Sequence, residues 1–422
     1  MYKADGMGGI FVLERSAAFA RAFVKWLAVA AVTGLIGGLV GSAFYLSVAK
    51  ATELRGEIPW LLYLLPLAGV AIAWLYRATR MEHEGTSEII GSIRSGEGVP
   101  LVLVPVIFVS TAVTHLCGGS AGREGAALQI GGGLGFAAGR LFHLDEKEQR
   151  MATLCGMSAL FSALFGTPLT AAVFALEVVS VGQLYYSGLV PCLAAALAAY
   201  GVTGLFGIAP TRFDIPFVAL TADGLWRVAV LAMLCALVSI LFCVAMHKSA
   251  HLAVKLLPNP CLRAAVGGAL IIALTLLLGT RDYNGAGVEV IAAALERGEA
   301  RPEAFLLKLL FTAVTLACGF RGGEVVPAFF IGSTFGCAAG ALLGLDPGFA
   351  AGIGLVAVFC GAVNCPVASM FLSVELFGSG EILYFALACC VSYMLSGYTG
   401  LYSSQKIMYS KLRPEFIDIN AK

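Results

Sequence analysis

The sequence predicts an all-α membrane protein that crosses the bilayer many times and is built from two copies of one unit. Hydrophobic residues make up 59% of its 422 residues and charged residues only 13%, unlike a soluble globular chain. Several apolar stretches are long enough to span about 30 Å of hydrocarbon, and a polar, glycine-rich motif recurs in the two halves. Backbone groups in lipid must be satisfied internally, so we expect the apolar stretches to be helices.

The apolar stretches are almost free of charge. Trp26–Ala49, Val228–His247 and Ile382–Gln405 contain no Asp, Glu, Lys or Arg, and Glu177 is the only such residue between Met151 and Gln183. The chain lacks the ten-residue alternation of an outer-membrane barrel.

A repeat organises the chain. Gly122-Arg123-Glu124 recurs as Gly322-Gly323-Glu324, and the spacing of Gly156, Pro168 and Glu177 recurs in Gly354, Pro366 and Glu375. We therefore divide the chain into an N-terminal segment (1–19), a first transmembrane repeat (20–206), a linker (207–222), a second repeat (223–402) and a short tail (403–422).

Each repeat is expected to contain the same elements in the same order. A long apolar helix and a second helix are followed by a short amphipathic element, a span that leads into the Gly-x-Glu loop, and a Gly-rich helix. A helix pair broken by proline and a closing apolar stretch complete the unit. The expected ranges are 24–50, 58–77, 85–94, 125–141, 150–166, 168–179 and 184–206, and then 224–250, 262–279, 287–297, 325–343, 349–363, 366–377 and 382–400.

Short, broken helices at equivalent places in two halves indicate a binding site in the middle of the membrane. A helix that ends inside a membrane protein aims backbone N–H groups and its positive dipole end at the interior, which attracts an anion. Glycines before each helix start, such as Gly122 and Gly323, let the backbone approach an ion closely. Pro327 lies in the first turn of its helix, where its missing N–H costs least.

A carboxylate in an apolar setting is a functional-site candidate. Glu124 would repel a bound anion unless it takes up a proton or moves away. The same residue would then compete with the anion when charged and leave the site when protonated, which provides a mechanism for exchanging an anion against a proton.

Other classes of function find little support. The twelve cysteines are scattered through apolar segments without a paired metal spacing, so we expect no metal site and no cofactor. The sequence shows no basic tract for nucleic acid and no catalytic signature of an enzyme. A transporter for a cation or an organic acid is disfavoured, because the loops supply amides rather than convergent acids.

Both chain ends are basic. Lys3, Arg15, Arg21 and Lys25 precede the first span, and Lys406, Lys411, Arg413 and Lys422 follow the last. The positive-inside rule places both termini in the cytoplasm, with an even number of crossings.

The loop Gly118–Ala126, followed by Gln129-Ile130-Gly131-Gly132, resembles the GREGP-type loop of the CLC family of chloride channels and anion/proton antiporters. The resemblance extends over about residues 20–410 and includes the late Gly400-Leu401-Tyr402-Ser403. It implies a homodimer in a bacterial-type inner membrane, with one pore per subunit between inverted-topology repeats of tilted, broken and short helices. It also implies that Glu124 is the gating glutamate and that Tyr402 lines the anion site.

Three departures make the chain similar to the fluoride/proton antiporter branch of that family. The Gly-Ser-Gly-Ile-Pro element of chloride-type members is absent from His83–Ile89. Glutamate stands before the proline in Gly323-Glu324-Val325-Val326-Pro327. The proton-relay glutamate of chloride exchangers is replaced by Val178. The proline usual after GREG is Ala126 here, and the threonine expected near Val326 is missing. The resemblance thus implies proton-driven export of fluoride, with chloride/proton antiport or passive chloride conduction as the alternative.

A fluoride site must replace water with short, dense donors. We expect these from the backbone amides of Gly125, Ala126, Val325 and Val326, the Tyr402 hydroxyl and Thr86, with Glu84 as the alternative to Thr86. Glu124 and Glu324 would hand over the proton, and the loop support would come from Gly122, Arg123, Gly323 and Pro327.

Simpler structural roles stay open for several of these residues. Glu124 could pair with Arg123, Glu324 with Arg321, and Tyr402 could be an interfacial aromatic residue. We expect Glu177 and Glu375 to cap or pack the broken helices, His115 to be a packing residue, and Gly131–Gly133 to mark close helix contact.

Overall fold

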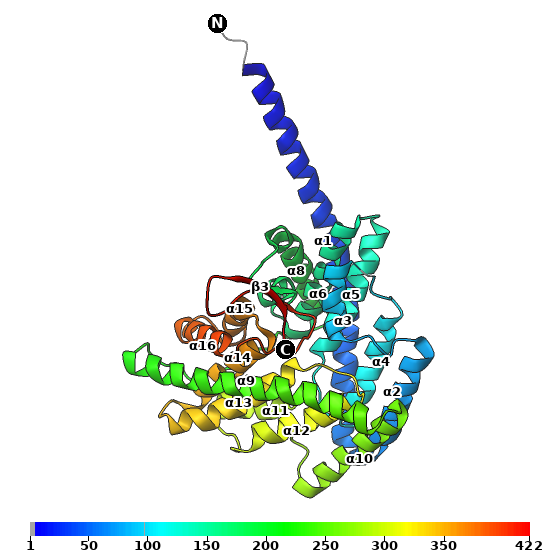
Figure 1. The fold of residues 1–422 in the computed structure, drawn as a ribbon, viewed down its shortest axis with the longest axis vertical. Coiled ribbons are helices and arrows are strands. Elements are labelled where there is room, and N and C mark those ends of the chain that lie inside the picture. Colours follow the sequence, from blue (N-terminus) through cyan, green and yellow to red (C-terminus); the bar gives the residue numbers. More distant parts are fainter. Residues whose placement is uncertain (1–4, 97) are drawn as a thin grey trace.

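The computed structural model describes residues 5–96 and 98–422; Lys3 lies outside these residues. Helices account for most of the fold, and the N-terminal part of α1 projects away from the rest of the molecule (Figure 1). The first repeat contains α1 (Asp5–Glu57), η1 (Pro59–Leu64), α2 (Leu65–Thr79), α3 (Thr86–Ser95), α4 (Leu103–Leu116), α5 (Glu124–Leu141), α6 (Glu146–Phe165), α7 (Pro168–Glu177), η2 (Tyr186–Gly188) and α8 (Leu189–Leu205).

The second repeat follows the same order, in agreement with the predicted unit. It contains α9 (Ala222–Leu256), α10 (Pro260–Leu278), α11 (Val288–Ala292), the π-helical turn η3 (Ala293–Arg297), α12 (Ala304–Ala317), α13 (Val325–Leu342), α14 (Pro347–Val363), α15 (Pro366–Phe377) and α16 (Ile382–Leu395). Within the described residues, six helical segments are long and apolar enough to cross a membrane: Ser16–Glu57, Pro59–Thr79, Tyr186–Leu205, Ala222–Leu256, Pro260–Leu278 and Val325–Leu342.

Some predicted boundaries were wrong. The first helix was expected over 24–50, but α1 also includes the more polar residues on either side of that apolar run. The closing stretch was expected over 382–400, but α16 ends at Leu395, and Gly397 has a positive φ of 59°. A left-handed glycine shortly after the last helical residue is a common way for a helix to stop. The amphipathic element expected over 287–297 is one short α-helix followed by the π-helical turn.

Local capping explains where several helices begin. The Asp145 side chain accepts a hydrogen bond from the backbone nitrogen of Glu148 at the start of α6, as part of a capping box. Asp346 accepts from the nitrogens of Gly348 and Phe349 at the start of α14. The equivalent helices of the two repeats are therefore started by the same device, an aspartate at the N-cap.

The glycines of the repeat allow two equivalent close helix crossings. A Cβ atom added at Gly131 of α5 would lie 2.5 Å from the carbonyl oxygen of Gly156 in α6. At Gly332 of α13 it would lie 2.4 Å from the carbonyl oxygen of Gly354 in α14. Any larger residue would push the helices apart, so the prediction that Gly131 marks close helix contact is confirmed.

Glu177 and Glu375 cap the broken helices across the repeat boundary, which confirms the predicted capping role. The carboxylate of Glu177, at the end of α7, accepts hydrogen bonds from the backbone nitrogens of Val367 (3.2 Å) and Ala368 (2.8 Å) in the first turn of α15. Glu375, near the end of α15, accepts in the same way from Leu169 (3.0 Å) and Thr170 (2.8 Å) in α7. The two acids satisfy the otherwise unpaired N–H groups at each other's helix starts.

The tail expected after the second repeat folds back onto the helices. β2 (Lys406–Tyr409) pairs in parallel with β1 (Ser180–Val181) and antiparallel with β3 (Phe416–Asn420). Ile407 of β2 is fully buried and pairs with Val181 of β1. The tail is thereby attached to the first repeat, just after α7.

Candidate functional site

The two Gly-x-Glu loops meet in a symmetrical backbone bridge. The nitrogen of Gly122 donates to the carbonyl oxygen of Gly323 at 2.7 Å, and the nitrogen of Gly323 donates back to the carbonyl oxygen of Gly122 at 2.8 Å. An added Cβ atom at Gly323 would lie 2.5 Å from the nitrogen of Gly125. Glycine is therefore needed where the loops touch, and the starts of α5 and α13 face the same place.

Glu124 lies across both helix starts. Its side chain is completely buried, and Oε2 accepts hydrogen bonds from the backbone nitrogens of Arg123 (2.9 Å) and Val326 (3.3 Å). The other carboxylate oxygen, Oε1, is buried without a hydrogen-bond partner among the described residues. The carboxylate thus occupies the position at the start of α13 where the helix dipole and free N–H groups favour negative charge.

The guanidinium groups near the two loops have partners other than the glutamates. Arg123 lies 4.2 Å from the ring centroid of Tyr45 and donates to the carbonyl oxygen of Leu164 at 3.4 Å. Arg321 lies 3.8 Å from the ring centroid of Tyr76 and donates to the carbonyl oxygen of Glu84. Within residues 5–96 and 98–422, neither arginine forms a salt bridge with Glu124 or Glu324, so the expected Glu324–Arg321 pair was wrong. Glu124 is a partner of Arg123 only through the backbone nitrogen of that residue.

Glu324 is the residue immediately before α13. It is partly exposed as a whole, but its Oε2 atom is buried and lacks a hydrogen-bond partner in the described chain. Glu324 and Glu124 are close enough to act on each other electrostatically. Pro327 stands in the first turn of α13, as predicted, and Val325 and Val326 are both buried. A buried, unpartnered carboxylate oxygen is costly unless a proton or a ligand shares the site.

Thr86 and Gly125 lie together at this meeting point. The Thr86 hydroxyl donates to the carbonyl oxygen of Gly125 at 3.4 Å and accepts from Nε2 of Gln129 at 3.1 Å. An added Cβ atom at Gly125 would lie 3.0 Å from that hydroxyl and 3.1 Å from the carbonyl oxygen of Gly322. Thr86 begins α3, so a third helix start is brought to the two loops. Ala126, the next residue of α5, is fully buried.

Tyr402 follows α16 and is almost completely buried. Its hydroxyl has no hydrogen-bond partner in the part of the chain that the structure describes, and Glu324 and Glu124 are both close enough to act on it electrostatically. The backbone on either side is held by Leu401, whose nitrogen donates to Ala362, and by Gln405, whose nitrogen donates to Tyr402. A buried Tyr402 is inconsistent with an aromatic residue at the membrane interface, so that alternative was wrong.

A polar cluster of Asn364, Gln405 and Lys411, hereafter the Asn364 cluster, holds the segment that carries Tyr402. Asn364 caps α14 with a left-handed backbone (φ 57°) and donates to Gln405 Oε1 at 3.1 Å. Gln405 Nε2 donates to the carbonyl oxygens of Val178 (3.0 Å) and Val363 (2.8 Å). Lys411 Nζ donates to Asn364 Oδ1 at 2.5 Å. The cluster therefore joins the ends of α7 and α14 to the tail.

Two cations, one fully and one partly buried, lie near the first glycine loop. Lys308 of α12 is fully buried and donates to the carbonyl oxygens of Gly285 (2.6 Å) and Tyr283 (3.2 Å). Arg55 of α1 donates to the carbonyl oxygen of His115. The prediction that His115 is a satisfied packing residue is only half right, because Nδ1 hydrogen-bonds to Thr111 while Nε2 is buried without a partner among the described residues.

Most of the predicted site residues come together in the structure, while some supporting residues were not predicted. Val178, where the relay glutamate of chloride exchangers was expected, is a buried core residue. Gln129, Asn364, Gln405 and Lys411 were missed. Asn364 offered a signal, because it directly precedes Cys365-Pro366 at the predicted helix break. Among the described residues, no group of three or more His, Cys, Asp or Glu side chains is arranged to hold a metal ion.

Comparisons with known proteins agree on one family. A family model described as "Voltage gated chloride channel" matches residues 68–397. A "Chloride/fluoride channel protein" of Pseudomonas syringae pv. tomato is 39% identical, with 92% of this chain and 87% of that protein covered. The "H(+)/Cl(-) exchange transporter ClcA" of Vibrio cholerae is 26% identical, with 81% and 80% covered. The crystal structure of a CLC-type fluoride/proton antiporter superimposes with a TM-score of 0.87 at 30% identity, over 90% of this chain and 98% of that chain.

Proposed function

This chain belongs to the CLC family of voltage gated chloride channels and related anion/proton antiporters, and we propose that it exports fluoride from the cytoplasm in exchange for protons. The observation that carries the proposal is the hydrogen bond between Glu124 Oε2 and the backbone nitrogen of Val326. A carboxylate and a small anion seek the same N–H groups, so only one can occupy the start of α13 at a time.

The exchange follows from that competition. When Glu124 is charged, it occupies the start of α13 and excludes the anion. When it takes up a proton, the attraction of the helix dipole for it falls and an anion replaces it. Glu324, whose buried Oε2 has no partner among the described residues, is the second group for the proton. A protonated carboxyl is also a strong donor to fluoride.

The surroundings favour an anion over a cation. Arg55 lies close to the glycine loop and donates to the backbone carbonyl oxygen of His115. It forms no salt bridge with a carboxylate among the described residues. A cation held in a low dielectric without a salt-bridge partner raises the local affinity for anions. A cation pathway would instead need convergent carboxylates or carbonyl oxygens.

Fluoride is favoured over chloride by the residues that this chain has and lacks. Glu324 stands directly before α13, and the serine element of chloride-type members is absent from 83–89. The relative from P. syringae has fluoride in its name, and the structure that superimposes with a TM-score of 0.87 is that of a fluoride/proton antiporter. We assign the fluoride contacts to Thr86, the Tyr402 hydroxyl and the amides of Gly125, Ala126, Val325 and Val326. Gly122, Arg123, Gly323 and Pro327 support the loops.

The proposed function also implies how the protein is placed in the membrane. We propose that it lies in the bacterial-type inner membrane with both termini in the cytoplasm, because the residues around the first and last spans are basic. We also propose a homodimer with one pathway per subunit. In each subunit the pathway follows the meeting line of the two repeats, at the Gly122–Gly323 bridge.

One experiment tests the central claim. Purified protein is placed in vesicles loaded with fluoride or with chloride, and anion efflux and proton uptake are recorded together. We expect fluoride to leave faster than chloride while protons enter. Glu124→Gln should abolish proton uptake coupled to fluoride, whereas Glu57→Gln, an exposed acid at the end of α1, should change neither flux.

Chloride transport is the second candidate, as proton exchange or as passive conduction. It is favoured by Val326, which stands where the fluoride branch is expected to have threonine, and by the chloride named for the ClcA relative. Equal fluoride and chloride efflux would reject the fluoride assignment. Anion efflux without proton uptake would reject exchange in favour of a channel.

A further inference from the structure

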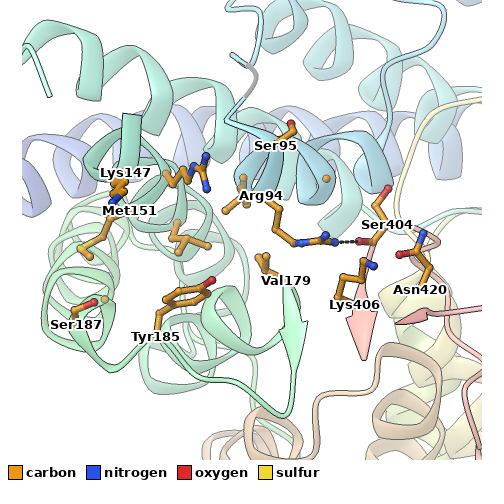
Figure 2. A pocket seen from close by; sticks show the side chains of 15 residues that line it. Arg94, Ser95, Lys147, Met151, Val179, Tyr185, Ser187, Ser404, Lys406 and Asn420 are labelled. Atoms are coloured by element: carbon orange, nitrogen blue, oxygen red, sulfur yellow. Dashed lines mark hydrogen bonds between the residues drawn. The ribbon is translucent and has the colours of Figure 1, made fainter. Parts of the chain in front are cut away.

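A basic cavity lies away from the glycine loops. It has a volume of about 840 Å³, is partly open, and is lined by the end of α3, the start of α6, the segment before α8, and β2 and β3. Figure 2 shows Lys147 and Met151 on one side, Tyr185 and Ser187 below them, and Arg94 reaching across to Ser404. None of these residues belongs to the Glu124 site.

The lining of the cavity is strongly positive. It includes Arg94, Lys147, Arg150 and Lys406, and no Asp or Glu is found among its described lining residues. Lys406 is neutralised by an ion pair with Asp418 (2.9 Å), and Arg94 donates to the carbonyl oxygen of Ser404 at 3.3 Å. Arg94 keeps its charge but is directed at Ser404, whereas the side chains of Lys147 and Arg150 form no ion pair or hydrogen bond with another described residue and are the cations most available to a ligand.

The acidic residues next to Lys147 and Arg150 in the sequence do not neutralise the charges of these two side chains. Glu148 forms an ion pair with Lys25 at 2.6 Å, on the side of α1. Glu146 lines a separate small hollow behind Arg150 and forms no salt bridge with it. The Nε atom of Arg150 is buried without a hydrogen-bond partner in the described chain. A buried guanidinium donor without an acceptor is costly and suits a phosphate oxygen.

The position of the cavity points to a lipid as the source of that phosphate. Tyr185 lines the cavity, and the adjacent Tyr186 begins a segment long and apolar enough to cross the membrane. Tyr185 and Tyr186 are 48% and 76% exposed, as expected of aromatic residues at the headgroup level. In the proposed orientation this level faces the cytoplasmic leaflet, which attracts basic groups when its lipids are anionic.

We propose that this cavity binds the phosphate of an anionic phospholipid headgroup, with Lys147 and Arg150 as its main contacts. The site also touches the transport pathway. Arg94 lies on α3, which begins at Thr86, and its hydrogen-bond partner Ser404 is two residues after Tyr402. A headgroup bound by α6 therefore lies against the hydrogen bond that joins α3 to the Tyr402 segment. The assignment of the site to the cytoplasmic leaflet rests on the proposed function, but the proposal that a headgroup binds there does not.

Binding is tested with the purified full-length protein in a neutral detergent. Short-chain phosphatidylglycerol, short-chain phosphatidylcholine, inorganic phosphate and glycerol phosphate are each titrated, and the thermal unfolding midpoint is followed. We expect phosphatidylglycerol alone to raise the midpoint at low concentration, with an effect that weakens as salt is added. Lys147→Gln and Arg150→Gln should each weaken the response about fivefold, and Arg150→Lys should restore most of it.

Arg77→Gln is the matched control, since Arg77 is an exposed cation at the end of α2 that does not line the cavity. It should respond like the wild-type protein. An equal response to phosphatidylcholine, or unchanged binding by Arg150→Gln, would overturn the proposal. Inorganic or glycerol phosphate acting at the same concentration as phosphatidylglycerol would also overturn it, in favour of a soluble ligand.

Transport is measured separately, in vesicles of phosphatidylcholine with and without phosphatidylglycerol. We expect Lys147→Gln to lower fluoride efflux only in the vesicles that contain phosphatidylglycerol. A protein that binds the headgroup but does not exchange fluoride would contradict the proposed function and leave the lipid site standing.

Discussion

The carboxylate of Glu124 accepts a hydrogen bond from the backbone nitrogen of Val326, which lies 202 residues later in the chain. An acid from the first repeat thus neutralises the helix start of the second. Neither repeat contains this contact by itself. The place where an anion would bind is therefore defined only when the two repeats meet, and the following predictions probe how that meeting is built.

Gly323→Ala should disrupt the bridge between the loops. The new methyl group would lie 2.5 Å from the nitrogen of Gly125 and 2.7 Å from that of Glu124, and backbone atoms cannot yield as a flexible side chain does. We expect a lower unfolding midpoint and fluoride efflux close to that of empty vesicles. Gly201→Ala in α8 has open space around it and should be neutral or stabilising by up to about 1 kcal/mol. Equal transport by the two variants would refute this role of Gly323.

Tyr402→Phe should weaken anion binding without weakening the fold. Its hydroxyl is buried and has no hydrogen-bond partner among the described residues, so its removal breaks no bond to the protein. We expect fluoride affinity, measured by calorimetric titration, to fall about tenfold, with an unchanged unfolding midpoint. Tyr384→Phe gives the opposite pattern, because that hydroxyl accepts from Thr221 and donates to Ala219. A destabilised Tyr402→Phe with normal affinity would contradict the prediction.

Glu177→Ala should destabilise the protein by about 2 kcal/mol or more. The change leaves the N–H groups of Val367 and Ala368 without their charged acceptor, and hydrogen bonds to a charged group are among the stronger ones. Glu375→Ala should cost a similar amount, because it uncaps α7 in the same way. Thermal unfolding in detergent measures both, with the exposed Glu82→Ala as control. A loss no greater than that of the control would show that these caps contribute little.

Lys411 should make stability depend on pH in the alkaline range. Burial lowers the pKa of Lys411, which lies in the tail outside the membrane-spanning helices, to about 8 from its ordinary value of 10.5. Between these two values the unfolded chain holds a proton that the folded chain has released, so stability rises with pH across that window. Below about pH 8 Lys411 is charged in both the folded and the unfolded chain, so the folded state carries the full free-energy cost of burying that charge.

The comparison with Lys411→Met isolates this effect from other titrating groups. We expect the unfolding midpoint of the wild-type protein to rise relative to that of Lys411→Met as the pH increases from about 8 to 10.5. Parallel curves for the two proteins would show that Lys411 titrates as an exposed lysine does.

The sequence allowed good predictions for features that both repeats share, such as helix starts at proline and close helix crossings at glycine. Pro168 and Pro366 begin helices, and Gly131 and Gly332 lie at close crossings; each signal is local and appears twice. Glu124 could be selected because an acid in an apolar chain needs a special reason. These features depend on neighbours in the sequence or on composition.

Partners that are distant in the sequence could not be predicted. The capping role of Glu177 was expected. Nothing near it in the sequence indicates that it accepts hydrogen bonds from the start of α15 and not from a helix that is closer in the chain. Lys411 looks like one more basic residue of a tail, and its contacts with Asn364 and Tyr393 depend on how β2 and β3 fold back. The helix end near Leu395 depended on backbone geometry at Gly397, whereas the stretch without charged residues continues to Gln405.

The cross-capping of α7 and α15 also bears on how such a chain could have arisen. Each acid serves the opposite unit, and the glycine bridge joins equivalent atoms on both sides. Two identical half-length polypeptides could form all of these contacts by pairing with each other, before any gene fusion tied them together. Fusion then allowed the halves to diverge: Glu124 reaches across to Val326, whereas Oε2 of the equivalent Glu324 has no hydrogen-bond partner among the described residues.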